Sequence, residues 1–313
     1  MKNSGIIELL HEHEELKNVN FPAGIEFSLD GDLLTVKLAS ACENMQTDKS
    51  AFEGWIICLK SWLPDNVIKV ELGWAQPEEA SNKHYNRFLF RVVQFQKMYT
   101  WFSVSKKNTE GVKIFIKEMQ SHHLIINYPK DIKHGSKSER KGEDYIESLF
   151  VNSYRNLIKD RFKIETLNQQ LPVGVFIDSI KRGAYFFSGQ KSAIDLWGIK
   201  GGELSIFELK YKNKKVGIIS EMLFYLALIR AVFMTGEIRY PTIAKEVKFR
   251  DFEKLYNNEF EKLTGYFLID ELHPFVGEEA IILINEGLRN LGNISVHKLY
   301  YKFDSVNNSL IWI

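Results

Sequence analysis

The segment Ser192–Tyr211 constrains the fold more than any other part of the 313-residue chain. It reads SAIDLWGIKGGELSIFELKY, with two runs of strand-favouring residues on either side of a Gly-Gly pair. Because glycine tolerates the positive φ of tight hairpin turns, this pattern predicts two antiparallel strands joined by a two-residue turn. With Lys200 opposite Glu203, the same register places Asp195 directly opposite Glu208.

Side-chain alternation decides which residues share a face of this predicted hairpin. Lys210 lies on the face of Asp195 and Glu208, because residues two apart on a strand point the same way. The other face carries apolar side chains: Ile194, Leu196, Phe207 and Leu209. Apolar residues on both faces predict a strand pair in the middle of a covered sheet, where an uncompensated charge is costly.

The two facing acids have a chemical consequence. Carboxylates on one rung have Cβ atoms about 4.5 to 5.5 Å apart, which is destabilising unless a positive charge lies between them. A divalent cation that prefers oxygen ligands, Mg²⁺ or Mn²⁺, supplies that charge and also binds phosphate oxygens. Lys210 would then orient or deprotonate a metal-bound water, or neutralise charge on the pentacovalent phosphorane. The pattern predicts metal-dependent phosphodiester hydrolysis; an ordinary ion pair on a solvated strand is the alternative for Glu208 and Lys210.

These residues also resemble the signature of a known family. Ile194-Asp195-Leu196, followed after the hairpin by Phe207-Glu208-Leu209-Lys210, is similar to the D-x(n)-(D/E)-x-K pattern of the PD-(D/E)XK nuclease superfamily, without its preceding proline. The resemblance covers approximately residues 143–233 and implies a restriction-endonuclease-like domain, with a central mixed sheet flanked by helices. It implies an Mg²⁺ or Mn²⁺ site with Lys210 as a catalytic residue and these metal-contacting positions: Asp195, Glu208, Leu209 and Glu147.

Two further parts of the family pattern have counterparts outside the hairpin. The family carries an acid on the helix before the sheet, which implies a metal-assisting role for Glu147, with Glu143 as its substitute. The alternative, for Glu143 above all, is a favourable interaction with the helix dipole. The RecB-like branch has QxxxY on the helix after the Glu-x-Lys strand. Glu221 and Tyr225 stand at this spacing, which implies site roles for both; an exposed Glu in a first helical turn is the alternative for Glu221.

A solvated stretch divides the chain into two predicted domains. Pro129–Gly142 (PKDIKHGSKSERKG) loses apolar residues and gathers Lys, Arg, Ser and Gly, which is typical of a linker. We therefore expect an N-terminal α+β domain of unknown role over residues 1–132, a linker over 133–142 and the nuclease-like domain over 143–313. The fold class of the whole chain is predicted to be α/β, in the sense of α+β overall.

Hydrophobic periodicity and turn residues predict the other elements. In the first domain we expect a hairpin at 25–38, a helix at 51–63, a strand at 67–72 and an aromatic-rich helix at 84–101. In the second we expect helices at 143–160, 218–234, 252–262 and 278–291, and strands at 173–180, 184–187, 264–269 and around 307–308. The helix at 84–101 is interpreted as packing, with base stacking by its aromatic residues as the alternative.

Composition narrows the class of protein. With 45% hydrophobic residues the chain has enough apolar material for folded cores, and a formal net charge of +1 argues against a broadly basic nucleic-acid binder. Its two cysteines have no CxxC spacing, which excludes a disulfide framework and indicates a reducing cytoplasm. The N-terminus does not read as a secretory signal, and charged residues in the longest apolar run favour a buried helix over a membrane span.

The expected function is therefore that of a cytoplasmic, Mg²⁺-dependent nuclease acting on DNA. Phosphate-loop, dinucleotide-binding and hydrolase-elbow motifs are absent from the sequence, and its His-rich pairs lack partner ligands at structured spacing. The alternative from another class is a catalytically inactive nuclease-fold module that binds nucleic acid or a protein partner. An RNA-directed enzyme, a homodimer and a protein partner bound through the N-terminal domain also stay open.

Overall fold

The computed structural model describes residues 1–313 except 46, 79–81, 131–141, 188–191, 305 and 308. By its contacts the chain forms two compact units. The first comprises Met1–His122, Lys215–Phe224 and Leu272–Gly292; the second comprises His123–Lys214, Tyr225–Glu271 and Asn293–Ile313. The expected linker at 133–142 falls mainly on residues 131–141, which lie outside the described residues. Two segments that we expected in the second domain, 215–224 and 272–292, belong to the first unit.

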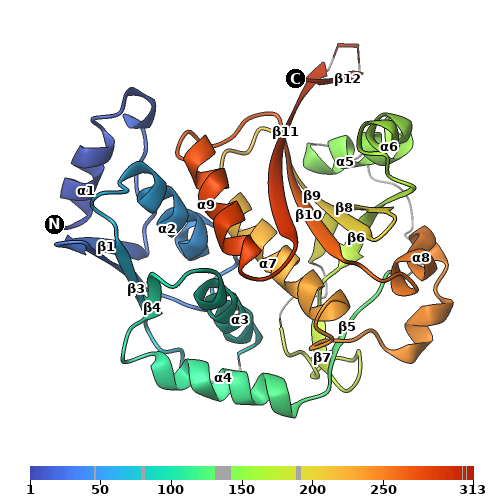
Figure 1. Ribbon diagram of the computed structural model, residues 1–313, viewed down its shortest axis with the longest axis horizontal. Helices are drawn as coiled ribbons and strands as arrows, with labels where there is room; N and C mark the ends of the chain where they lie inside the picture. Colours follow the sequence, from blue (N-terminus) through green and yellow to red (C-terminus); the bar gives the residue numbers. More distant parts are fainter. Residues whose placement is uncertain (46, 79–81, 131–141, 188–191, 305, 308) are drawn as a thin grey trace. The chain divides into compact units, whose positions relative to one another are not determined.

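A four-stranded sheet forms the framework of the first unit (Figure 1). Its order is β1-β2-β3-β4, in which β1 is antiparallel to β2 and the other neighbours are parallel. The strands are β1 (Ile25–Asp30), β2 (Leu33–Leu38), β3 (Lys69–Trp74) and β4 (Phe102–Val104). The predicted first hairpin is confirmed, with Asp30 paired to Leu33 and Gly31 at a positive φ of 56° in the turn.

Helices cover one face of this sheet. The parallel strands are joined through α2 (Phe52–Trp62) and α3 (Lys83–Met98), whose aromatic side chains meet those of the strands. The Phe88 ring on α3 lies 4.9 Å from Trp74 at the end of β3 and 5.5 Å from Phe52 on α2. The aromatic-rich helix is therefore core, as interpreted, because its rings are buried and not available to stack bases.

The remaining elements of the first unit include the two segments from later in the chain. The Trp62 indole Nε1 donates to the Phe275 carbonyl over 2.9 Å, and the Tyr99 hydroxyl donates to the Leu283 carbonyl over 2.9 Å. These bonds tie the region of α9 to α2 and to the end of α3. The other helices of this unit are α1 (Asn3–Leu10), α4 (Thr109–Ser121), α9 (Glu278–Arg289) and the first part of α7 (Gly217–Phe233), with short 3₁₀ turns η1 (Glu14–Leu16) and η2 (Asp48–Ser50).

A six-stranded mixed sheet forms the framework of the second unit, with the order β12-β11-β10-β9-β8-β6. Strands β9, β10 and β11 run parallel, whereas β8 is antiparallel to both β9 and β6, and β12 is antiparallel to β11. The strands are β6 (Thr166–Pro172), β8 (Ala193–Lys200), β9 (Glu203–Lys210), β10 (Lys262–Ile269), β11 (Ile294–Asp304) and β12 (Ser309–Trp312). The mixed α/β class predicted from sequence is confirmed.

Two helices pack against this sheet through a single apolar cluster. Ile146 and Phe150 of α5 (Glu143–Asn152) and Ile158 of α6 (Arg155–Phe162) are buried with the apolar face of the predicted hairpin, Leu196, Phe207 and Leu209. Nearly every residue of β9 is buried, as expected for a strand in the middle of a covered sheet. The smaller elements are β5 (Leu124–Ile126) paired with β7 (Val175–Ile177), 3₁₀ turns η3 (Thr242–Glu246) and η4 (Phe249–Asp251), and α8 (Phe252–Tyr256).

Several predicted boundaries are wrong. The single helix expected at 143–160 is two helices, α5 and α6, which Ser153 and Tyr154 separate. The helix expected at 252–262 ends at Tyr256, before a pair of asparagines, and the strand expected at 184–187 contributes one isolated bridge. The strand expected at 173–180 is shorter, β7, and follows the polar strand β6, which the apolar pattern did not predict. Elements α1, β4, α4 and β5 were likewise not predicted.

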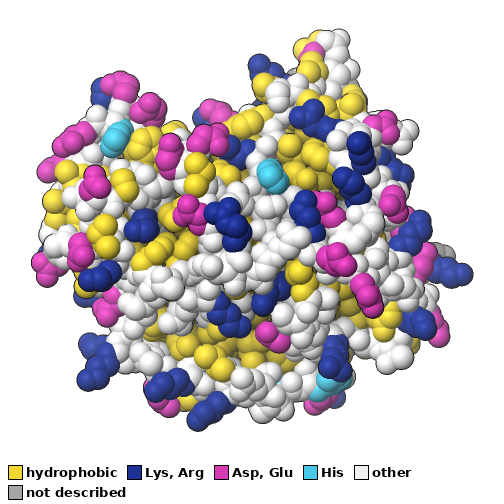
Figure 2. Space-filling model, in the orientation of Figure 1, with side chains coloured by type: hydrophobic (Ala, Val, Ile, Leu, Met, Phe, Trp, Pro, Cys, Tyr) yellow, Lys and Arg dark blue, Asp and Glu magenta, His cyan; other side chains and the backbone are white. Residues whose placement is uncertain are grey.

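The long helix α7 is buried along almost its whole length, which agrees with the expectation of a core helix. Among the described residues, no helix is both long and apolar enough to cross a membrane. On the face shown in Figure 2, acidic and basic side chains are interspersed, in keeping with the near-neutral formal charge of +1.

Candidate active site

The hairpin β8–β9 has the predicted register. Lys200 pairs with Glu203 and Leu196 pairs with Phe207, and Gly201 takes a positive φ of 54° in the turn. The paired residues end at Leu196 and Phe207, one residue short of the predicted pair of Asp195 and Glu208, so that pair stays a prediction extrapolated from the register. The local signals that position these acids are therefore the turn chemistry and the alternation of apolar residues.

Asp195 lies near the beginning of β8 and interacts electrostatically with the acids of α5, Glu147 and Glu143. Its Oδ2 accepts a hydrogen bond from the Leu209 backbone N–H over 2.8 Å. Burial raises the pKa of Asp195 to about 8; the Lys210 ammonium and the bond from Leu209 oppose the rise, and the Glu147 and Glu143 carboxylates add to it. A carboxyl group with this pKa is poised to exchange a proton for a cation near neutral pH.

Glu208 and Lys210 form a buried ion pair on β9. Their exposed fractions are 2% and 7%, and Lys210 Nζ donates to Glu208 Oε1 over 2.5 Å. The same ammonium lies 3.5 Å from Glu143 Oε1. The alternative of an ion pair on a solvated strand is correct in the ion pair and wrong in the solvation, because both side chains are buried. Buried charges of this kind require partners and are concentrated at functional sites.

Helix α5 supplies the remaining acids. Glu147 is 8% exposed, and its Oε2 accepts a hydrogen bond from Gln170 Nε2 over 2.8 Å. Glu143 is the first residue of the helix, which agrees with a favourable interaction with the helix dipole, and its Oε2 accepts from the Tyr211 backbone N–H over 3.4 Å. The structure thus brings the two predicted α5 acids to the ends of β8 and β9.

Gln170 is a member of this group that the sequence did not reveal. It lies in β6 between Gln169, which pairs with Leu196, and Leu171, and it has a positive φ of 54° that side-chain-bearing residues rarely adopt. Arg250 holds the distorted backbone, since its Nη1 donates to the carbonyls of Gln169 and Gln170 over 2.9 and 3.0 Å. The distortion faces Asp195 across the β6–β8 pair and carries the Gln170 amide to Glu147.

The other predicted site residues have different surroundings. The side chain of Leu209 lies in the apolar cluster on the opposite face. The backbone carbonyl is the one oxygen atom with which Leu209 could contact a metal. Glu221 lies in the part of α7 that belongs to the first unit; only 2% of it is exposed, so the alternative of an exposed Glu is wrong. Tyr225 belongs to the second unit and is also 2% exposed. The site roles of Glu221 and Tyr225 stay predictions.

Whether these residues fit a divalent cation depends on donor chemistry and charge. The group is rich in hard carboxylate oxygens, and its acidic neighbours help to raise the pKa of Asp195 to about 8. A cation would relieve this repulsion, so the residues fit one in donor type and charge. They do not form a ready-made coordination shell. Among the described residues, no three His, Cys, Asp or Glu side chains gather closely enough to hold a metal ion.

Comparisons with protein-family models, with curated proteins and with solved structures returned no match for this chain.

Proposed function

We propose that the protein is a metal-dependent nuclease that hydrolyses phosphodiester bonds in DNA. The observation that supports this proposal is the buried ion pair of Glu208 and Lys210 on β9, with Glu143 3.5 Å from the same ammonium. Asp195 on β8 interacts electrostatically with Lys210 and with the α5 acids Glu147 and Glu143. A further carboxylate beside the Glu208–Lys210 pair is costly to isolate from water unless a proton, a cation or a substrate compensates its charge. We also propose a cytoplasmic location, consistent with the free thiols of Cys42 and Cys58.

The carboxylates of Asp195, Glu208 and Glu147 would hold Mg²⁺ or Mn²⁺, with the Leu209 carbonyl as a further oxygen. When bound, the cation supplies positive charge to the phosphate oxygens of the substrate. Of the hard divalent cations, Mg²⁺ is the natural candidate because it is commonly held by one or two carboxylates together with substrate phosphates.

Lys210 has the second role in this proposal. Its ammonium is held by Glu208 at 2.5 Å and lies 3.5 Å from Glu143, so its position is fixed before substrate arrives. A preorganised positive charge stabilises negative charge that develops on phosphate oxygens during hydrolysis, without reorganisation at the moment of reaction. Glu143 and Glu208 therefore act on Lys210 by orienting it, and Gln170 orients Glu147 in the same sense.

A cleavage assay tests this proposal. The full chain is incubated with plasmid, single-stranded and branched DNA in Mg²⁺ or Mn²⁺, beside the variants Asp195→Asn, Glu208→Gln and Lys210→Met. Lys214→Ala is the matched control, because Lys214 is a nearby but exposed lysine that pairs with Glu271. We expect cleavage by the wild type and by the control, and a loss of at least about a hundredfold in the three variants, as is usual when one charged group of such a site is removed.

Metal binding is measured separately from cleavage, by calorimetric titration of Mn²⁺ into the same variants. Weaker binding by Asp195→Asn and Glu208→Gln, with folding retained, supports the site whatever the substrate. Cleavage that persists in all three variants would contradict the proposal. Metal-independent DNA binding without cleavage of any DNA or RNA substrate would favour the inactive binding module instead.

A further inference from the structure

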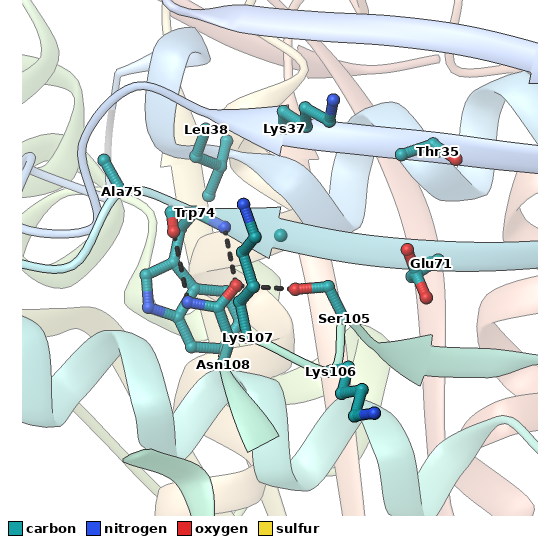
Figure 3. Close-up of a pocket in the computed structure, with 11 residues that line it drawn as sticks. Thr35, Lys37, Leu38, Glu71, Trp74, Ala75, Ser105, Lys106, Lys107 and Asn108 are labelled. Carbon is teal, nitrogen blue, oxygen red and sulfur yellow. Dashed lines mark hydrogen bonds between the residues drawn. The ribbon is translucent and has the colours of Figure 1, made fainter. Parts of the chain in front are cut away.

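The first unit contains a cavity that the proposed nuclease chemistry does not use. It has a volume of about 520 Å³ and lies at the carboxyl ends of the parallel strands β2, β3 and β4, where the chain continues into the loop before α4 (Figure 3). Open α/β sheets bind ligands outside the carboxyl ends of their strands, at points where the strand order reverses. The order β2-β3-β4 does not reverse here, so the case for a ligand rests on the residues that line the cavity. The volume is in the range of cavities that hold small molecules.

One face of the sheet forms the floor of this cavity. Helices cover the face that carries Trp74, whereas the neighbouring residues on the opposite face are polar or small. Thr35 pairs with Glu71 across one rung, and Lys37 pairs with Gly73 across the rung two residues further on. A Cβ atom at residue 73 would lie 3.2 Å from Ser105 Oγ, so only glycine leaves this part of the cavity floor free of side-chain atoms.

The loop after β4 forms the adjoining wall. The Asn108 side chain, only 1% exposed, fixes this loop to the end of β3: its Oδ1 accepts from the Trp74 backbone N–H over 3.1 Å, and its Nδ2 donates to the Trp74 carbonyl over 3.1 Å. Its Oδ1 also accepts from Ser105 Oγ over 2.7 Å. Lys106 and Lys107 lie between these two anchored residues, and in Figure 3 the Lys107 side chain extends from the loop across the end of β3 toward β2.

The charges that line the cavity are available to a ligand. Within the part of the chain that the structure describes, Lys37, Lys106, Lys107 and Glu71 make no ion pair or side-chain hydrogen bond. Three ammonium groups and one carboxylate give an excess of positive charge, which favours an anion. The beginning of α4 at Thr109, beside the lysines, adds the favourable end of a helix dipole.

The charges are also separated along the strands. The lysines gather at the Lys37–Gly73 rung and in the loop, whereas Glu71 and Thr35 lie two residues back, about 6.6 Å away at the usual rise of a strand. A carboxylate repels a phosphate but accepts hydrogen bonds from hydroxyl groups. The arrangement therefore suits a ligand with a phosphate at one end and hydroxyl groups at the other.

We propose that this cavity binds a sugar phosphate, either free or as the ribose phosphate of a nucleotide. The phosphate contacts Lys107, Lys106 and Lys37, and the sugar hydroxyls donate to Glu71. The proposal does not depend on the nuclease activity, because it uses none of the residues of the Asp195 group.

Calorimetric titration of the full chain with ribose 5-phosphate, AMP and inorganic phosphate tests this proposal. We expect both sugar phosphates to bind at least about tenfold more tightly than inorganic phosphate, since they alone engage Glu71 through charge-assisted hydrogen bonds. Equal affinities for ribose 5-phosphate and AMP assign the site to a free sugar phosphate, whereas tighter binding of AMP assigns it to a nucleotide.

Variants locate the binding. Lys106→Ala/Lys107→Ala should weaken every phosphate ligand at least about tenfold, the loss expected for charged hydrogen bonds. Glu71→Gln should weaken the two sugar phosphates but not inorganic phosphate. The control Lys97→Ala/Lys117→Ala removes the same charge from exposed lysines outside the cavity lining and should bind as the wild type does.

Three results would overturn the proposal. They are the absence of sugar-phosphate binding at millimolar concentration, equal losses in the control and in Lys106→Ala/Lys107→Ala, and lysine-dependent binding of oligonucleotides without binding of AMP or ribose 5-phosphate. Circular dichroism of each variant verifies folding, and the single variant Lys37→Ala, altered at an exposed strand residue, provides an independent measurement if the double variant does not fold.

Discussion

Gln170 donates a hydrogen bond from Nε2 to Glu147 Oε2 over 2.8 Å, from a strand position whose φ is +54°. This bond orients a proposed metal-binding carboxylate. Gln170→Leu should therefore weaken Mn²⁺ binding and cleavage by about tenfold or more, which is the usual effect of removing a side chain that hydrogen-bonds to a metal ligand. Steady-state cleavage and calorimetry measure the two effects. Gln169→Leu is the matched control, since the side chain of a neighbouring strand residue points to the opposite face. Equal effects of the two substitutions would contradict an orienting role.

The raised pKa of Asp195 gives the metal-free protein a specific dependence on pH. The folded state holds a proton on Asp195 up to a pKa of about 8, whereas the unfolded chain releases it near the ordinary value of 3.8. Between these values the folded state binds more protons, so the contribution of Asp195 to stability is fully present below pH 4 and is lost as pH rises toward 8. Asp195→Asn should remove this contribution and make the free energy of unfolding less dependent on pH.

Urea denaturation in EDTA at pH 5, 6.5 and 8 measures this difference. Relative to wild type, Asp195→Asn should become progressively more stable as the pH increases. Asp304→Asn is a suitable control, because hydrogen bonds from Asn307 and Val306 lower the pKa of this exposed acid and it does not titrate in this window. A parallel pH dependence in wild type and Asp195→Asn would show that Asp195 is ionised throughout.

Cation binding should show the complementary dependence. A divalent cation must displace the proton of Asp195, so its affinity should rise with pH, by up to about tenfold per pH unit below the pKa of that group. Titration of Mn²⁺ into the wild type at pH 6, 7 and 8, in buffers of different ionisation enthalpy, measures both the affinity and the number of protons released. An affinity that is constant from pH 6 to 8, without proton release, would exclude Asp195 as a ligand.

The sequence was sufficient to predict the hairpin because its determinants are local. Gly201 in the turn and the alternation of apolar residues set the register, and the register sets which charges meet. The role of Gln170 could not be predicted in this way. It depends on a backbone distortion held by Arg250, which is 80 residues away in sequence, and no local pattern reports such a bond.

The sequence also could not predict which of the two compact units contains the region of α9, for a related reason. The region of α9 lies in sequence between strands β10 and β11 of the second sheet, yet the Trp62 indole bonds to the Phe275 carbonyl and ties this region to the first unit. Hydrophobic periodicity correctly predicted a helix there, because the pattern reports which face is buried. The pattern does not indicate which surface covers that face. The hydrogen bond from Trp62 to Phe275, which are 213 positions apart, ties the helix region to the first unit.

Substitutions of the buried pair Lys210 and Glu208 should have non-additive effects on the free energy of unfolding. Lys210→Met leaves the carboxylate of Glu208, 2% exposed, without the ammonium at 2.5 Å, and breaking a buried ion pair in this way costs about 3 to 5 kcal/mol. Glu208→Gln/Lys210→Met removes both charges and should be more stable than the sum of the two single effects predicts, by about 1 to 3 kcal/mol. Urea denaturation of the wild type, both single variants and the double variant completes this cycle. Additive effects would mean that solvent or other groups screen the pair, and the preorganised position of Lys210 would lose its support.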